Sequence, residues 1–488
     1  MELERRTAPL ALGADEFRKI GHALVDDLAA LFEALESPSE LPLANDETPA
    51  DVQAALGGDG LPEHGTPAGE LVREARDLLL AHTTHIGHPR FWGYVCGSQA
   101  PIGALADLLA AAVNPNVGAW QLGPAATEIE RQTVRWLAEL IGYPAGSSGL
   151  LVSGGNMANF VGFAAARRAK APWDVARQGT GAGRLTAYCS AETHTWAHKA
   201  ADLFGIGGDS MRWIGTDAEQ RLDASLLREA IAADRAAGAH PFLVVGTGGS
   251  VSTGAVDPLP ELAAICREED LWFHVDGAYG GFAACLPDAP DDLKALALAD
   301  SVAIDPHKWL YVPVEAGCTL VRDEQTLIDT FAYRPPYYHL PEGQVNFYEL
   351  GPQNSRGFRA LKVWLALRQA GRTGYVEMIG EDCRLARLLH ELADADPELE
   401  ARTQGLSIAT FRYAPEGASE EELDELNERL LERLRTSGEA FVSNAIIDGR
   451  YYLRACFVNF RTQEADVRAL PGIVKRLGAE VAAGLTVS

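Results

Sequence analysis

Lys308 is the residue of this sequence that most directly suggests covalent chemistry. It lies in the segment DPHKWL (residues 305–310), directly after the apolar run Ser301–Ile304. A lysine beside a buried strand is removed from water, which disfavours its charged form and leaves a nucleophilic amine. Such an amine condenses with an aldehyde to form a Schiff base. The alternative is a surface lysine in an ordinary loop, and the strand-end setting favours the nucleophile.

Asp276 is the second residue with a chemical signature. It follows the apolar run Leu271–Val275. A strand-end carboxylate can pair with a protonated pyridine nitrogen, which pyridoxal phosphate (PLP) requires in order to accept electrons. Capping of a following helix is the alternative role. Ala278 is small and could lie against the face of a cofactor ring. Lys308 and Asp276 together predict PLP as the cofactor.

A glycine turn supplies a possible phosphate site. Gly154, Gly155 and Asn156 follow the run LLVS and open a helical stretch. Backbone N–H groups at a helix N-terminus, with the positive end of the helix dipole, bind phosphate. A plain tight turn is the alternative, and the segment matches neither a P-loop nor a GxGxxG motif. We expect His307 and Asp305 to add contacts on the phosphate side.

Histidines offer a stacking residue and raise the question of a metal. His194 follows the predicted strand Leu185–Cys189, where an imidazole can stack on a planar cofactor ring. It also forms an HxxxH pair with His198, and a second histidine cluster comprises His82, His85 and His88. Zincins require Glu directly after the first His of such a pair, and this residue is absent. The sequence therefore predicts no metal site.

The elements that must position these residues alternate between strand and helix. Four short apolar runs predict strands, namely Leu185–Cys189, Phe242–Val245, Leu271–Val275 and Ser301–Ile304. Helical stretches such as Leu259–Glu269 lie between them. This alternation predicts an α/β fold with a mostly parallel sheet and helices on both faces. Ligands of such sheets bind beyond the carboxyl ends of the strands, where Asp276 and Lys308 lie.

Patterns at the two ends of the chain differ from this central region. Apolar residues recur at helical spacing from Phe17 to Leu35, and we predict that residues 1–85 form an N-terminal helical arm. Residues 86–360 would form the large domain, and residues 361–488 a smaller α+β domain. Its predicted elements are a helix at Leu361–Gln369, a strand at Leu406–Tyr413, a helix at Glu420–Arg435, a strand at Tyr452–Phe460 and a helix at Glu464–Leu477.

Composition excludes several functional classes. The formal charge of −26 over 488 residues argues against sequence-independent nucleic-acid binding and against an acidic membrane surface as a partner. No apolar run reaches the length of about 18 residues that a membrane helix needs, and the N-terminus shows no secretory signal. The 7 cysteines are scattered and form no CxxC pair. We therefore expect reduced thiols and a cytoplasmic location.

Five motifs in order make the chain resemble a known family. They are HPRFWGY (88–94), SGGNMANF (153–160), SAETH (190–194), HVDGAYGG (274–281) and DPHKW (305–309). Together they resemble the group II PLP-dependent decarboxylases, which include aromatic-L-amino-acid, histidine and glutamate decarboxylases. The resemblance covers nearly the whole chain. It implies PLP-dependent transferase fold type I, as in aspartate aminotransferase, carbon–carbon lyase activity, and a homodimer with its active sites at the interface.

The resemblance also assigns roles to residues. Lys308 would hold PLP as a Schiff base, Asp276 would pair with the ring nitrogen, and His194 would stack on the ring. A lid tyrosine would protonate the substrate carbon after carbon dioxide leaves. Spacing from Lys308 favours Tyr337 for this role over Tyr338.

Two sets of residues complete the implied site. The phosphate would be held by Gly154, Gly155, Asn156 and His307, with Asp305 at the position where the family has Asn or Asp. Tyr94, Trp92 and Trp120 are placed in the substrate pocket.

Departures from the family concern the substrate pocket. Tyr94 is followed by Val95, Cys96 and Gly97 instead of Phe-Pro-Thr, and Gly118 is the best match to a phenylalanine that crosses the dimer interface in the family. Both changes remove bulk, so the pocket is expected to be larger or differently shaped.

The sequence thus favours a decarboxylase for an aromatic or otherwise bulky L-amino acid, without naming the substrate. The first alternative is an aldehyde synthase on the same fold, in which phenylalanine usually replaces the lid tyrosine. A non-catalytic relative is disfavoured by the intact Lys308, Asp276 and His194. A nicotinamide-dependent oxidoreductase is disfavoured because no GxGxxG motif opens a helix after a first strand.

Overall fold

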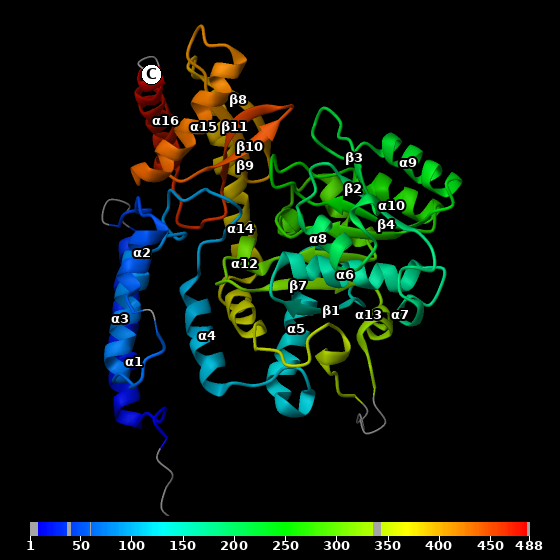
Figure 1. The fold of residues 1–488 in the computed structure, drawn as a ribbon, viewed down its shortest axis with the longest axis horizontal. Helices are drawn as coiled ribbons and strands as arrows, with labels where there is room; N and C mark the ends of the chain where they lie inside the picture. Colours follow the sequence, from blue (N-terminus) through cyan, green and yellow to red (C-terminus); the bar gives the residue numbers. More distant parts are fainter. Residues whose placement is uncertain (1–7, 37–40, 59, 335–342, 486–488) are drawn as a thin grey trace, which may run out of the picture.

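A seven-stranded mixed sheet forms the centre of the molecule (Figure 1). The computed structural model describes residues 8–36, 41–58, 60–334 and 343–485. In spatial order the strands are β1 (Ser148–Val152), β7 (Gly317–Val321), β6 (Ser301–Ile304), β5 (Trp272–Asp276), β4 (His240–Thr247), β2 (Leu185–Ser190) and β3 (Met211–Ile214). Strands β6, β5, β4, β2 and β3 run parallel, whereas β7 is antiparallel to both of its neighbours. The predicted, mostly parallel sheet and its four predicted strands are confirmed.

Both faces of this sheet are buried by helices. Successive side chains of a strand point to opposite faces and so enter two different hydrophobic clusters. On β1, Leu150 and Val152 belong to one hydrophobic cluster and Leu151 to another. Helices α6 and α8 contribute to the first cluster, and α5, α9, α10 and α14 to the second. Their bounds are α5 (Pro124–Leu140), α6 (Gly155–Lys170), α8 (Trp196–Leu203), α9 (Ala224–Ala236), α10 (Leu259–Glu268) and α14 (Ala360–Asp394).

Short helices complete the large part of the chain. They precede or follow strands along the chain, and α12 carries the central residues of the DPHKWL motif. Their bounds are α7 (Val175–Gln178), α11 (Asp291–Lys294), α12 (Pro306–Trp309) and α13 (Glu324–Phe331).

The N-terminal segment forms a helical arm beside the main body. Helix α1 (Ala14–Leu35) confirms the helix predicted from Phe17 onward, and α2 (Pro49–Leu56) and α3 (Ala68–Ala81) follow. Helices α1 and α3 contact each other and run side by side at the edge of the molecule (Figure 1). Helix α4 (Pro101–Val113) then leads into the large part.

A second, antiparallel sheet forms the C-terminal part. Its strand order is β10 (Ser443–Ile447), β11 (Arg450–Cys456), β9 (Ile408–Tyr413) and β8 (Leu399–Gly405). Helices α15 (Glu420–Ser437) and α16 (Glu464–Leu485) pack with this sheet around a separate hydrophobic core. The predicted small α+β part is therefore present, with two further strands at its edges.

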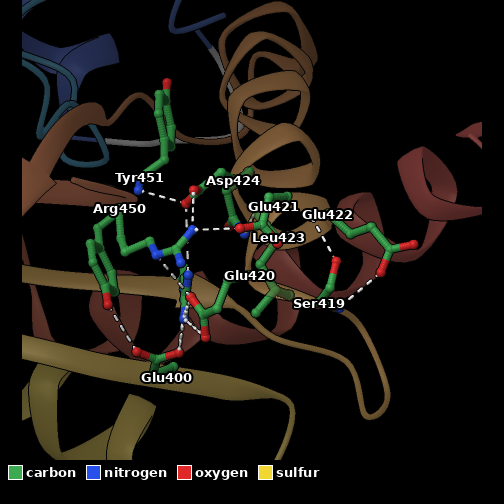
Figure 2. A network of polar contacts seen from close by, with 12 residues as sticks. Glu400, Ser419, Glu420, Glu421, Glu422, Leu423, Asp424, Arg450 and Tyr451 are labelled. Carbon is green, nitrogen blue, oxygen red and sulfur yellow. Dashed lines mark hydrogen bonds and ion pairs between the residues drawn. The ribbon is translucent and has the colours of Figure 1, made fainter.

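Ion pairs join α15 to this sheet, and a helix cap defines where α15 begins (Figure 2). Arg450 of β11 lies 3.2 Å from Asp424 and 3.5 Å from Glu421, both on α15. Ser419 Oγ accepts a hydrogen bond from the Glu422 backbone N–H at 3.3 Å, and Glu422 Oε2 accepts one from Ser419 N at 2.8 Å. This reciprocal capping box sets the start of the helix where the sequence predicted it.

Helix α14 connects the two parts. We predicted that it ends near Gln369, but it continues to Asp394, with a kink at Gly371, where φ is 65°. The glycine bends the helix without ending it. The chain returns to helical geometry after Gly371 because α14 packs against β8 and β9. Since α14 also packs against α4 and α5, the domain boundaries at residues 85 and 360 stay predictions.

Candidate active site

Three neighbouring parallel strands bring the predicted chemistry to one edge of the sheet. Asp276 at the end of β5 is in register with Thr247 at the end of β4 and with Ala303 of β6. Asp305 and Lys308 follow β6 directly, on and beside α12. A cavity of about 380 Å³ opens at this edge. Its lining includes every cofactor-binding residue predicted from the sequence, namely Gly154, Gly155, Asn156, His194, Asp276, Ala278, Asp305, His307 and Lys308.

Lys308 is held by a carboxylate. Its Nζ atom lies 3.0 Å from Asp305 Oδ2. Burial acts to lower the pKa of Lys308, but the Asp305 and Asp276 carboxylates outweigh it, and the net effect is a raised pKa. The expectation that burial leaves a neutral amine is therefore wrong in these surroundings, because two anions share the site with the lysine.

Both oxygens of Asp276 accept hydrogen bonds from the protein. Trp196 Nε1 donates to Oδ2 at 2.7 Å, and the Ala278 backbone N–H donates to Oδ1 at 3.1 Å. The arrangement therefore presents a carboxyl group of fixed orientation to the cavity, where a ring nitrogen could pair with it.

His194 lies at the same cavity, between the end of β2 and the start of α8. Its Nδ1 accepts a hydrogen bond from the Trp196 backbone N–H at 3.3 Å. Burial lowers the pKa of His194, more than the nearby Asp276 carboxylate raises it. The neutral imidazole that results is suited to lie against an aromatic ring.

The first turn of α6 forms a cradle in which side chains have no room. Gly154 has a φ of 144°, which only glycine adopts readily. A Cβ atom added to Gly155 would lie 2.6 Å from Asp305 Oδ2 and 3.2 Å from the Ala278 Cβ atom. Backbone N–H groups of this 16-residue helix are therefore open to a close-lying anion. His307 adds an imidazole to the cavity, and burial lowers its pKa.

These features fit PLP. The cavity offers a lysine for an aldehyde, a fixed carboxylate for a ring nitrogen and a glycine cradle for a phosphate. In the described chain, Asp305 Oδ1 is also buried without a hydrogen-bond partner, so the site contains a polar atom that protein groups leave unsatisfied.

Several residues predicted for the substrate pocket lie elsewhere. Trp92 is fully buried in the hydrophobic core of the C-terminal part, where its Nε1 donates to Thr462 Oγ1 at 3.1 Å. Its assignment to the pocket is corrected, because the ring is enclosed by that core. Tyr94, which packs near Phe441, and Trp120 are also absent from the cavity lining. Tyr337 and Tyr338 fall outside the described residues.

Sequence reasoning also missed residues that line the cavity. They include Asn159, Glu192, Thr247 and Trp196. Thr247 could have been found from its place at the carboxyl end of β4, because parallel strands deliver their ends to one site. Trp196 gives no such signal, since a tryptophan in an apolar helix is ordinarily a core residue.

The described residues also bear on two other classes of protein. No group of three or more His, Cys, Asp or Glu side chains is placed to hold a metal ion within the described ranges. No helix in the described part of the chain combines the length and the apolar character needed to cross a membrane.

Comparison with known proteins identifies the family. Residues 49–414 match the family described as pyridoxal-dependent decarboxylase conserved domain. An aromatic-L-amino-acid decarboxylase of Bacillus atrophaeus is 34% identical, over 97% of each chain. A 4-hydroxyphenylacetaldehyde synthase of Rhodiola rosea is 30% identical, over 87% of this chain and 88% of its own length. The crystal structure of Oryza sativa TDC with PLP and tryptamine superposes with a TM-score of 0.90 at 29% identity, covering 97% of this chain and 99% of that one.

The lysine, carboxylate and glycine cradle thus occur in a chain that matches the family model over residues 49–414 and a PLP-bound structure over 97% of its length. The chain belongs to the pyridoxal-dependent decarboxylase family and is a PLP-dependent amino-acid decarboxylase.

Proposed function

We propose that this enzyme removes the carboxylate of an aromatic L-amino acid and releases the amine. The observation that carries the proposal is the convergence of Lys308, Asp276 and His194 on one cavity that also contains the glycine cradle. The choice of an aromatic substrate rests on the relatives, since the bacterial relative is an aromatic-L-amino-acid decarboxylase and the rice structure contains tryptamine.

Each side chain then has a distinct task at the cofactor. When bound, PLP supplies a conjugated ring that takes up the electrons of the bond to the substrate carboxylate. Lys308 Nζ binds the cofactor covalently and yields its place to the substrate amine. Asp276 holds a proton at the ring nitrogen, and His194 lies against the ring and restricts its tilt.

We assign the phosphate side to neutral hydrogen-bonding groups. Gly154, Gly155 and Asn156 present backbone N–H groups at the start of α6, and His307 contributes an imidazole. Asp305 is assigned to Lys308 rather than to the phosphate, because a carboxylate and a phosphate repel each other while Lys308 Nζ lies 3.0 Å from Asp305 Oδ2.

A tyrosine supplies the final proton. We assign Tyr337 to donate its hydroxyl proton to the substrate carbon, with Tyr338 as the other candidate. A positioned acid of this kind contributes about 10²- to 10⁴-fold to a rate. Without it the carbon stays reactive, and the second candidate function, an aldehyde synthase, becomes accessible. That alternative is kept because a 4-hydroxyphenylacetaldehyde synthase is 30% identical to this chain.

We further propose that the enzyme is a homodimer. An apolar groove of about 1040 Å³ runs between α1, α3 and α4. Leu105 and Leu108 on α4 are each 54% exposed and line this groove, and Phe17 on α1 is 57% exposed. Apolar surface of this extent is ordinarily covered by a partner, and sedimentation analysis of the purified protein tests whether a second copy covers it. A cytoplasmic location is supported by the 7 free cysteines.

Product analysis tests the proposed reaction. PLP-loaded enzyme is incubated with L-tryptophan, L-tyrosine, L-phenylalanine and L-glutamate, and the products are identified by mass spectrometry. We expect an amine from one or more of the aromatic substrates and none with Lys308→Ala. An aldehyde with ammonia would instead assign the enzyme to the aldehyde synthases. Turnover of L-glutamate alone would refute the aromatic assignment.

A further inference from the structure

Trp196 contacts two residues that the proposed function places at the cofactor ring. It begins α8 and is 1% exposed. Its indole N–H donates to Asp276 Oδ2 at 2.7 Å, and its backbone N–H donates to His194 Nδ1 at 3.3 Å. One residue of the chain therefore links the carboxylate at the end of β5 to the imidazole that follows β2.

The state of Asp276 depends on how its proton is shared with a ring nitrogen. In a site that excludes water, two protonation states of this pair compete. One is a carboxylate with a pyridinium, and the other is a neutral carboxylic acid with a neutral pyridine, which burial favours because it penalises both charges. Donors that bind only to the carboxylate tip this balance toward the ion pair. Asp276 has two such donors, Trp196 Nε1 and the Ala278 backbone N–H. Trp196 supplies the only one of the two that a side-chain substitution can remove.

Other charged or titratable groups that face Asp276 do not replace this contact. Lys308 and His194 lie close enough to interact with it electrostatically. His274, on β5 itself, is fully buried, and burial lowers its pKa. Its Nε2 lies 2.7 Å from Asn159 Oδ1, and its Nδ1 lies 2.7 Å from Ser301 Oγ, so both ring nitrogens are already engaged. The neutral His274 ring packs edge-on against Trp196, with 6.0 Å between the ring centroids.

We propose that Trp196 is a positioning residue that keeps Asp276 ionised and thereby keeps the ring nitrogen of bound PLP protonated. The proposal rests on the role of Asp276 in the proposed function. It adds a residue that does not touch the reacting atoms and that nonetheless sets how strongly the ring withdraws electrons. A different group of the same residue, the Trp196 backbone N–H, donates to His194 Nδ1 and so leaves the ring proton of His194 on Nε2.

The test reads the proton directly. Enzyme is loaded with PLP labelled with ¹⁵N at the ring nitrogen, and its ¹⁵N resonance is recorded between pH 6 and 9 for wild type, Trp196→Phe and Asp276→Asn. Trp213→Phe is the matched control, because Trp213 stacks on His198 and is absent from the cavity lining. We expect Trp196→Phe to move the resonance toward that of unprotonated pyridine, and Trp213→Phe to leave it unchanged.

Kinetics supply a second readout. Loss of one hydrogen bond to a charged group should lower kcat by about ten- to a hundredfold. KM should change little, because Trp196 is not assigned to the substrate. If Trp196→Phe fails to fold, benzothienylalanine at position 196 replaces the N–H by sulfur with the shape of the ring preserved.

The outcomes separate this proposal from the one on which it rests. A resonance that moves in Asp276→Asn but stays at the wild-type position in Trp196→Phe would overturn the role of Trp196 and leave that of Asp276 intact. A resonance that moves in neither variant would overturn both roles. A shift in Trp213→Phe equal to that in Trp196→Phe would show a general effect of removing an indole and would also overturn the proposal.

Discussion

Lys308 Nζ and Asp305 Oδ2 lie 3.0 Å apart in a cavity where the Asp305 side chain is only 1% exposed. The pair joins Lys308, the residue proposed to bind the cofactor, to the last residue before α12, three positions earlier. A buried carboxylate at this distance favours the protonated ammonium, whereas attack on an aldehyde requires the neutral amine. Asp305 therefore controls how readily Lys308 reacts.

Asp305→Asn should make Lys308 more reactive. Removing the carboxylate removes a cause that raises the pKa of Lys308, so burial lowers that pKa further and more neutral amine is present at pH 7–8. We expect Schiff-base formation between apoenzyme and pyridoxal to become several-fold faster at pH 7.5, with its pH profile moved to lower pH. Pyridoxal is used because it has no phosphate, which excludes a change in phosphate repulsion as the cause.

Stopped-flow absorbance measures this reaction. The exposed Asp291→Asn serves as the control, since the Asp291 side chain is 98% exposed and lies outside the cavity lining. A pH profile for Asp305→Asn that coincides with that of the wild type would contradict the role assigned to this pair.

The role proposed for Tyr337 predicts a change of product as well as of rate. If its hydroxyl protonates the substrate carbon, Tyr337→Phe should lower amine formation by about 10²-fold or more. The unprotonated carbon should instead react with oxygen, giving aldehyde, ammonia and hydrogen peroxide with one oxygen consumed per turnover. Oxygen-electrode and peroxide assays detect this, with Tyr338→Phe as the matched variant. If Tyr338→Phe changes the product and Tyr337→Phe does not, the assignment moves to Tyr338.

Much of the site could be predicted from the sequence because its residues follow strands. The run Ser301–Ile304 matches β6 in both bounds, and Leu185–Cys189 is one residue short of β2. Once these strands are parallel, their ends must meet, and the motifs that follow them must share a site. Strand β7 was missed, since it is a short apolar segment that runs antiparallel to its neighbours and has no alternating helix to mark it.

What the sequence could not provide depends on contacts between distant residues. The pKa of Lys308 is raised by two carboxylates, first Asp305 and then Asp276, and Asp276 approaches the lysine from another strand. Trp92 fills a core formed largely by residues after 385, more than 290 positions away along the chain. The hydrogen bond from Trp196 to Asp276 spans 80 positions. Local patterns determine strands and helices, whereas these relationships arise only when the elements pack.

Gly118 makes a prediction about stability. It occupies the position of a bulky family residue, but an added Cβ atom would lie 2.0 Å from the Asn354 carbonyl oxygen. Since that atom belongs to the backbone, it cannot move aside cheaply, and Gly118→Ala should destabilise the fold by about 1–3 kcal/mol. Gly472→Ala, at an exposed position of α16 with nothing within 4 Å, should instead be neutral or stabilising by up to about 1 kcal/mol. Equal thermal midpoints for both variants would contradict the packing argument.

Asp382 predicts how stability depends on pH. This carboxyl lies on α14, is 2% exposed, and accepts hydrogen bonds from Trp309 Nε1 at 2.8 Å and Tyr311 OH at 2.7 Å. Burial raises its pKa to about 7, in spite of these donors. Because the folded pKa lies above the unfolded value, the folded protein binds the proton more tightly. The resulting stability is present at low pH and is lost as pH rises through about 7.

Asp382→Asn should flatten this dependence, because asparagine has the shape of the protonated acid and no charge to bury. Wild type should lose about 2–4 kcal/mol from this group between pH 5 and 8, and the variant should not. Thermal unfolding at several pH values measures the difference, with Glu377→Gln, an exposed carboxylate of the same helix, as the control. Equal slopes in the two proteins between pH 5 and 8 would contradict this prediction and would show that Asp382 is ionised throughout that range.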